Sequence, residues 1–188
     1  MQIPLSILTG QEPAPPPRLR AVRREPQPHI ISVWRLASDE QIAELLQDPA
    51  QIAALFDEEG PELDLGRAWH GLHFLLTGTA RATAGPRGYI LGGQALGEVP
   101  VGYGPARGFT QAQAAAFDDL LHCLALPELR RRFDAQAMID ADVYPNHWER
   151  ALTGEEDLFG ELAGHFVRLR DFVAGARRDG MGLLTYLA

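Results

Sequence analysis

Residues 65–78 have the sequence LGRAWHGLHFLLTG. Four large apolar residues recur there at i, i+4, i+7 and i+11, the spacing of one helix face: Leu65, Trp69, Leu72 and Leu76. Asp64 stands where it can cap the start of this helix, and Gly78 stands where the helix must stop. An apolar stripe of this length has to be buried, so the helix is predicted to pack against a core.

Upstream of this helix the sequence predicts one strand and two helices. Residues 29–36 form a β-branched, apolar run of strand length. Ser38 and Gln41 have the spacing of a capping box, which marks the start of a helix. Pro49 suits the first position of a second helix, which the Gly60-Pro61 pair ends.

Downstream, a glycine-rich and aromatic region predicts short strands. The expected strands are 89–91, 94–99 and 103–109. Antiparallel pairing as a meander is expected, because the spacing leaves no room for the crossovers that parallel strands need.

The last third of the chain is predicted to be mostly helical. The expected elements are an amphipathic helix after a capping box of Thr110 and Gln113, short helices within 127–141, a long helix from Thr153 and a closing strand at 183–187. Strands and helices are segregated along the chain rather than alternating. The predicted fold class is therefore α+β, a single compact domain with a short, mostly antiparallel sheet.

Composition divides the chain into an arm and a domain. The chain has 188 residues, enough for one domain, and 7 of its 14 prolines lie in residues 1–28. This proline- and arginine-rich arm buries little apolar surface and is expected to be dispensable for folding. Residues 29–188 are expected to form the domain.

Charge and cysteine content exclude several classes of protein. Residues 29–188 carry 23 acids against 13 arginines, a net charge of −10, and the chain has no lysine. Such a surface disfavours nucleic acid and favours basic partners. No apolar run is long enough to span a membrane, and the start lacks the features of a signal peptide. The single cysteine, Cys123, excludes a disulfide framework, so a cytoplasmic location is expected.

Several motifs occur together in one order: WHGLHFLLTG at 69–78, ILGG at 90–93, YGPAR at 103–107, RFD at 132–134 and YP at 144–145. With these motifs the chain resembles the YfbM-like family over residues 29–188. The resemblance implies a compact α+β domain of bacterial type and no established biochemical activity. The family pattern has a short start and lacks the arm at 1–28.

His70 and His73 are the first candidate site residues. They lie three residues apart on one helix and project from neighbouring positions, where two histidines can share a metal. A third ligand is missing, and no metal is predicted. A pocket for a small molecule or partner, or hydrogen-bonded structural roles, remain the alternatives. The glycines of 85–108 lack a phosphate-binding or dinucleotide-binding pattern, so no cofactor is predicted.

Arg107 and Tyr103 form the second candidate group. A glycine-proline turn precedes Arg107 and can present its guanidinium to a carboxylate or phosphate. The alternative is an internal salt bridge with Asp142 or Asp134, which we favour. The ring of Tyr103 is expected in the core, with its hydroxyl on a polar partner. Cys123 is expected to be a buried, inert thiol.

Residues 142–148, with the sequence DVYPNHW, are the third candidate. The segment concentrates aromatic and titratable side chains around a proline: Asp142, Tyr144, His147 and Trp148. This composition is typical of binding surfaces and also of packed loops.

Two hypotheses follow. The first is a non-enzymatic acidic binding module that engages a basic protein, with an immunity or antitoxin protein as one version. The alternative is a hydrolase or transferase that acts on an anionic small molecule with His70, His73, Tyr103 and Arg107 in one pocket. The absence of a paired nucleophile and base favours the first. Nothing in the sequence decides the oligomeric state.

Overall fold

The computed structural model describes residues 29–57 and 59–188. The predicted arm at 1–28, and its expected dispensability, lie outside the described residues.

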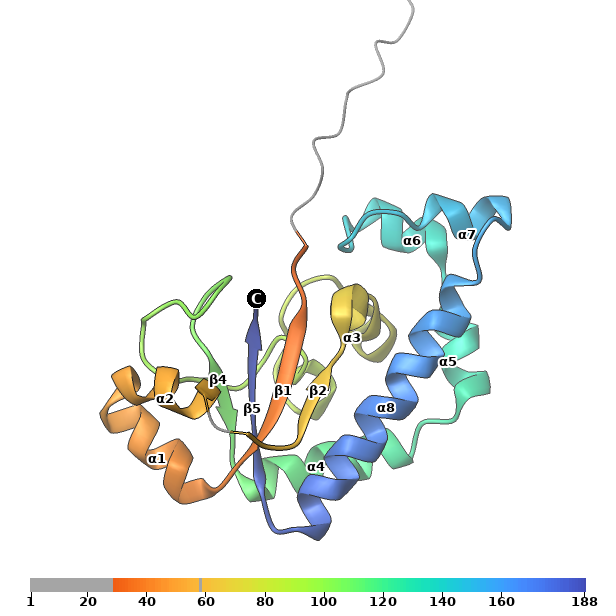
Figure 1. Ribbon diagram of the computed structural model, residues 1–188. Helices are drawn as coiled ribbons and strands as arrows, with labels where there is room; N and C mark the ends of the chain where they lie inside the picture. Colours follow the sequence, from red (N-terminus) through yellow and green to blue (C-terminus); the bar gives the residue numbers. More distant parts are fainter. Residues whose placement is uncertain (1–28, 58) are drawn as a thin grey trace, which may run out of the picture.

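A five-stranded sheet forms the centre of the molecule, in the order β2-β1-β5-β4-β3. The strands are β1 (Ser32–Ala37), β2 (Glu62–Asp64), β3 (Gln94–Ala95), β4 (Arg107–Phe109) and β5 (Gly182–Leu187). Every neighbouring pair is antiparallel. The last strand of the chain lies between β1 and β4 (Figure 1), and its pairing with β1 runs from Ser32↔Leu187 to Ala37↔Gly182.

Side chains alternate between the two faces of this sheet and build two clusters. On one face, Trp34 and Leu183 join the main core, which includes residues of α3 (Trp69–Thr77), α4 (Gln111–His122) and α8 (Leu158–Arg178). On the other face, Ala37 and Leu184 pack with residues of α1 (Asp39–Gln47) and α2 (Ile52–Asp57). Helices therefore cover both faces of the sheet (Figure 1). Because successive side chains of a strand point to opposite faces, alternate residues enter different clusters.

The shorter elements connect these layers. They are the 3₁₀ turns η1 (Pro49–Gln51), η2 (Gly66–Ala68) and η3 (Pro86–Gly88) and the helices α5 (Leu126–Arg132), α6 (Ala135–Asp140) and α7 (Glu149–Thr153). Figure 1 shows α6 and α7 together beyond one end of α8.

The predicted fold class and both capping boxes are confirmed. The domain is α+β with an antiparallel sheet. Gln41 N–H donates to Ser38 Oγ at 3.2 Å, and Gln113 N–H donates to Thr110 Oγ1 at 3.3 Å. In each box the glutamine side chain returns to the backbone N–H of the cap residue. The short helices of 127–141 and the closing strand are also present as α5, α6 and β5.

The predicted start of the central helix is wrong. Residues 62–64 pair with β1 as a strand, and Leu65 N–H donates to Ser32 O at 2.9 Å. Asp64 Oδ1 accepts from Gly66 N–H at 2.6 Å, a turn that precedes η2, and α3 begins only at Trp69. The apolar stripe of this helix is buried as expected. The residues expected to form its first turn instead form a strand and a 3₁₀ turn, because they pair with a distant segment.

Two further boundaries differ. The expected strand at 89–91 is a turn, because Leu91 N–H donates to Gly88 O and Gly92 N–H to Tyr89 O. Only β3 and β4 of the predicted meander pair with each other. The long helix begins at Leu158 rather than Thr153, because Gly154, with φ +74°, ends α7 and Asp157 caps α8.

Candidate functional site

His70 is held between two backbone groups. Its Nδ1 accepts from Tyr144 N–H at 2.9 Å, and its Nε2 lies 2.8 Å from Ala80 O. An imidazole nitrogen that accepts a hydrogen bond carries no proton, so the proton is on Nε2 and the ring is neutral. Both ring nitrogens of His70 are therefore engaged within the fold.

His73 is fully buried on the same helix. Its Nε2 lies 2.8 Å from Arg81 O, so Nε2 donates there. Its Nδ1 has no hydrogen-bond partner among the described residues. The two histidines together tie α3 to the segment after it, which is the structural alternative considered for them.

Trp69, His70 and Tyr144 form a continuous stack of rings. The Trp69 ring lies 4.9 Å from His70 and 5.5 Å from Tyr144, centroid to centroid, and both pairs are nearly parallel. Trp69 Nε1 donates to Ile30 O at 3.0 Å, and the Tyr144 hydroxyl accepts from Ile30 N–H at 2.9 Å. The stack thus fastens the segment just before β1 to α3.

The aromatic residues of 142–148 are buried rather than presented to solvent. Tyr144 is 9% exposed and Trp148 is 2% exposed. Trp148 Nε1 donates to Val143 O at 2.7 Å, and Asn146 Nδ2 donates to Asp142 Oδ1. The structure supports the packed-loop alternative for these rings, so they do not supply exposed anchors for a partner.

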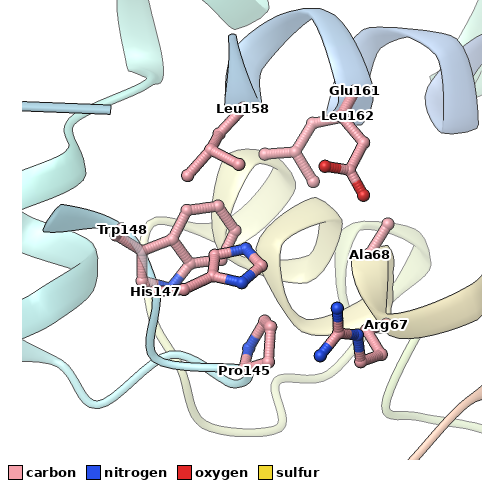
Figure 2. Close-up of a pocket in the computed structure, with 8 residues that line it drawn as sticks. All are labelled: Arg67, Ala68, Pro145, His147, Trp148, Leu158, Glu161 and Leu162. Carbon is pink, nitrogen blue, oxygen red and sulfur yellow. The ribbon is translucent and has the colours of Figure 1, made fainter. Parts of the chain in front are cut away.

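His147, the remaining candidate in this loop, borders a small pocket against α8. Figure 2 shows its ring beside Trp148, with Leu158, Leu162 and Glu161 above them on α8 and Arg67 on the other side. Burial lowers the pKa of His147, and the nearby Arg67 lowers it further. The pocket has a volume of about 10 Å³, room for a single water and no organic ligand.

Tyr103 and Arg107 line a larger cavity, of about 250 Å³, beside the end of β5. The expectation of a core ring for Tyr103 is wrong, since that residue is 53% exposed. The favoured salt bridge of Arg107 is also wrong. Arg107 Nη1 donates to Gly93 O at 3.2 Å, and within residues 29–57 and 59–188 no carboxylate lies at ion-pair distance from it. Arg107 is the first residue of β4 and pairs with Ala95 of β3 on one side and Thr185 of β5 on the other, and the Gly-Pro turn before it carries Tyr103.

The four residues of the enzyme hypothesis do not meet in one pocket. His70 and His73 point to the carbonyls of residues 80 and 81, and neither lines the cavity of Tyr103 and Arg107. Leu187 and Ile90 also line it, although neither was predicted as a site residue. Both stood at apolar positions of expected strands, and Ile90 also belongs to the ILGG motif. Neither signal indicates a cavity, because the cavity depends on where β5 is inserted.

Cys123 is exposed, so its expected burial is wrong. It is the C-cap residue of α4. In the described part of the chain, no group of three or more His, Cys, Asp or Glu is placed to hold a metal ion. None of the described helices is long and apolar enough to cross a membrane.

Stability is expected to fall at mildly acidic pH because of these histidines. Burial is the main cause that lowers the pKa of His70 and of His73. The unfolded chain takes up protons from about pH 6.5 downward while the folded chain does not, so stability is complete above that pH and is lost below it. Urea unfolding measured from about pH 7.5 to 5 checks this.

The matched variant is His73→Gln, whose side-chain amide can still donate to Arg81 O but does not titrate. Its free energy of unfolding should fall less steeply with acid than that of the wild type. Equal slopes for the two proteins would remove His73 from the explanation.

Comparison with known proteins supports the family expected from the motifs. A model of the family DUF1877, a domain of unknown function, matches residues 30–186. The fold is similar to the crystal structure of a protein of unknown function, YfbM from Escherichia coli. The TM-score is 0.67 and the identity 25%, over 84% of this chain and 99% of that chain. No curated protein matches this chain.

Proposed function

The chain belongs to the DUF1877 family, domains of unknown function, and from that premise we propose that it is a non-enzymatic binding module whose acidic body engages a basic protein. An immunity or antitoxin protein is one form of this proposal, in which the basic partner is a toxin. The proposal rests on how charge is distributed over the domain.

The observation that carries it is an acidic segment at residues 38–64. This segment has nine carboxylates and no arginine, lysine or histidine. Seven of the nine belong to exposed residues of the described chain: Asp39, Glu40, Glu44, Asp48, Glu59, Glu62 and Asp64. The segment folds as α1, η1, α2 and β2, so its charges lie on consecutive elements (Figure 1, orange to yellow).

Among the described residues, little neutralises these charges. Arg35 approaches Glu62 at 4.0 Å from the adjacent strand, and its side chain is only 8% exposed. Asp39 Oδ1 accepts from Gln111 N–H at 2.7 Å, a hydrogen bond from a backbone group that carries no opposite charge. Leu46, 36% exposed, lies among the acids of α1 and offers an apolar contact. The acidic segment therefore produces a local negative electrostatic potential, and Leu46 adds a small exposed apolar contact.

Such a field acts mainly on how fast a basic partner arrives. Attraction between opposite charges raises the association rate, and it is screened over about 8 Å at physiological ionic strength. Dissociation depends on the desolvated contacts made after docking. Because Tyr144 and Trp148 are buried, their substitution should change folding rather than the dissociation rate.

The test is a pull-down from the native host at low salt, followed by kinetics with the purified partner. The charge variant is Glu44→Gln with Asp48→Asn, in which the amide oxygen introduced at position 48 can still accept from Ala50 N–H. We expect the association rate to fall several-fold with little change in dissociation, the usual effect of peripheral charges. Added salt should slow the association of the wild type.

The matched control is Asp171→Asn with Asp179→Asn. It removes the same number of charges at α8, which packs on the other face of the sheet. An equal loss of association rate in both variants would assign the effect to net charge and contradict docking at the acidic segment. A dominant partner that is acidic, or binding indifferent to salt, would contradict the proposal as a whole.

A further inference from the structure

We propose that the cavity between the end of β5 and the Tyr103–Arg107 turn binds a small aromatic monocarboxylate. This inference does not depend on the proposed protein partner, since it concerns a different set of residues. It rests on the shape of the cavity, its apolar lining and an arginine at its edge.

The cavity exists because β4 is shorter than the strand it pairs with. β4 pairs with β5 only through Arg107↔Thr185, Gly108↔Leu184 and Phe109↔Leu183. The preceding residues leave the strand, and Tyr103 N–H returns to Leu187 O at 2.8 Å. The arch of residues 104–106 therefore encloses a space beside the last residues of β5.

Most side chains that line the cavity are apolar, and one aromatic ring among them is exposed to solvent. Ile90 is 3% exposed and forms part of the wall with Leu91, Pro105 and Leu187. Tyr103 contributes a ring that is half exposed. The volume of about 250 Å³ exceeds the ~150 Å³ that accommodates a benzene ring in an apolar protein cavity. A single aromatic ring with a short side arm therefore fits the space.

Arg107 supplies the charge that selects an anion. A guanidinium has five N–H donors, and in the described part of the chain one of them is bonded, to Gly93 O. No described carboxylate pairs with it, although the domain has 23 acids against 13 arginines. A carboxylate at this edge of the cavity would satisfy the remaining donors in the planar, two-point geometry that arginine favours.

The backbone of β5 adds a second donor. In an antiparallel ladder the N–H and C=O of one residue point to the same side. Leu187 O accepts from Tyr103 N–H, so Leu187 N–H also faces the side of the cavity. One guanidinium and one amide suit a single carboxylate better than a phosphate with two charges, and the apolar wall disfavours a second charged group.

Phenylacetate is the probe, and its neutral amide, phenylacetamide, is the matched ligand. Titration followed by amide resonances in two-dimensional NMR should shift those of Tyr103, Arg107 and Leu187. A ligand of this size is expected to bind with a Kd of about 1 mM or below. The carboxylate should bind about tenfold more tightly than the amide, the usual gain of a charge-assisted hydrogen bond.

Two variants test the assigned roles. Arg107→Met should abolish the preference for the carboxylate, and Tyr103→Ala should weaken both ligands. Tyr103 is exposed, so its substitution leaves the core intact and gives a test that does not depend on how Arg107→Met folds. Arg178→Met is the control, because that arginine is 75% exposed at the end of α8 and its loss removes the same charge.

Each outcome decides the proposal. Binding at Leu187 with the preference lost only in Arg107→Met supports it. Equal affinity for phenylacetate and phenylacetamide, binding elsewhere on the protein, or an equal effect of Arg178→Met would overturn it. If phenylacetate does not bind at a concentration about ten times the expected Kd, the cavity holds only water, and the proposal is equally overturned.

Discussion

Trp69→Ala is expected to lower the free energy of unfolding by about 3–5 kcal/mol, as large truncations in a core do. Trp69 is 7% exposed, and its ring stacks with the rings of His70 and Tyr144. Its removal opens a cavity and also leaves Ile30 O without the indole donor. Unfolding in urea, monitored by circular dichroism, measures the change.

Trp69→Phe separates the two contributions to this loss. The ring stack is largely kept while the hydrogen bond to Ile30 O is removed, so a smaller loss of about 1–2 kcal/mol is expected. A change below about 1 kcal/mol for Trp69→Ala would show that the stack is not part of the core that stabilises the fold.

Trp148→Ala should cost a similar amount, about 3–5 kcal/mol, through another part of the core. The indole is 2% exposed and packs directly over the backbone of α3 at Gly71. A Cβ at Gly71 would lie 2.7 Å from Trp148 Cη2 and 2.9 Å from Leu162 Cδ2. The glycine therefore allows the close approach, and the indole fills the space between α3 and α8.

His147→Ala is the control for this prediction. His147 is the neighbouring residue of the same loop but only borders the small pocket, so its truncation should change stability by less than about 1 kcal/mol. If Trp148→Ala keeps full stability and loses only binding to a partner, the loop is a recognition surface rather than part of the core.

Local signals in the sequence located most of the elements. The capping boxes at Ser38 and Thr110 marked their helices because a cap is formed by residues three positions apart. The family motifs indicated the family for the same reason, since they are short and continuous. The predicted boundaries of helices and strands were wrong where pairing with a distant strand competed with a local preference. Residues 62–64, which pair with β1, are an example.

The candidate site was less predictable than the fold. Tyr103 and Arg107 were predicted as a pair on one turn, and the structure places both at one cavity. It also joined them to His70 and His73, which bind backbone carbonyls instead. Residue type suggests what a side chain can do, but hydrogen-bond partners on other segments decide what it does.

The sequence alone determined the fold class, the acidic balance of the domain, the helix caps and the family, because each depends on composition or on residues near one another in the chain. Only the tertiary structure decided that β5 lies between β1 and β4, that Tyr144 and Trp148 are buried, and that Arg107 borders a cavity. The pairing of Ser32 with Leu187 joins opposite ends of the domain. No local period encodes such a contact, since it becomes favourable only when both strands share one core.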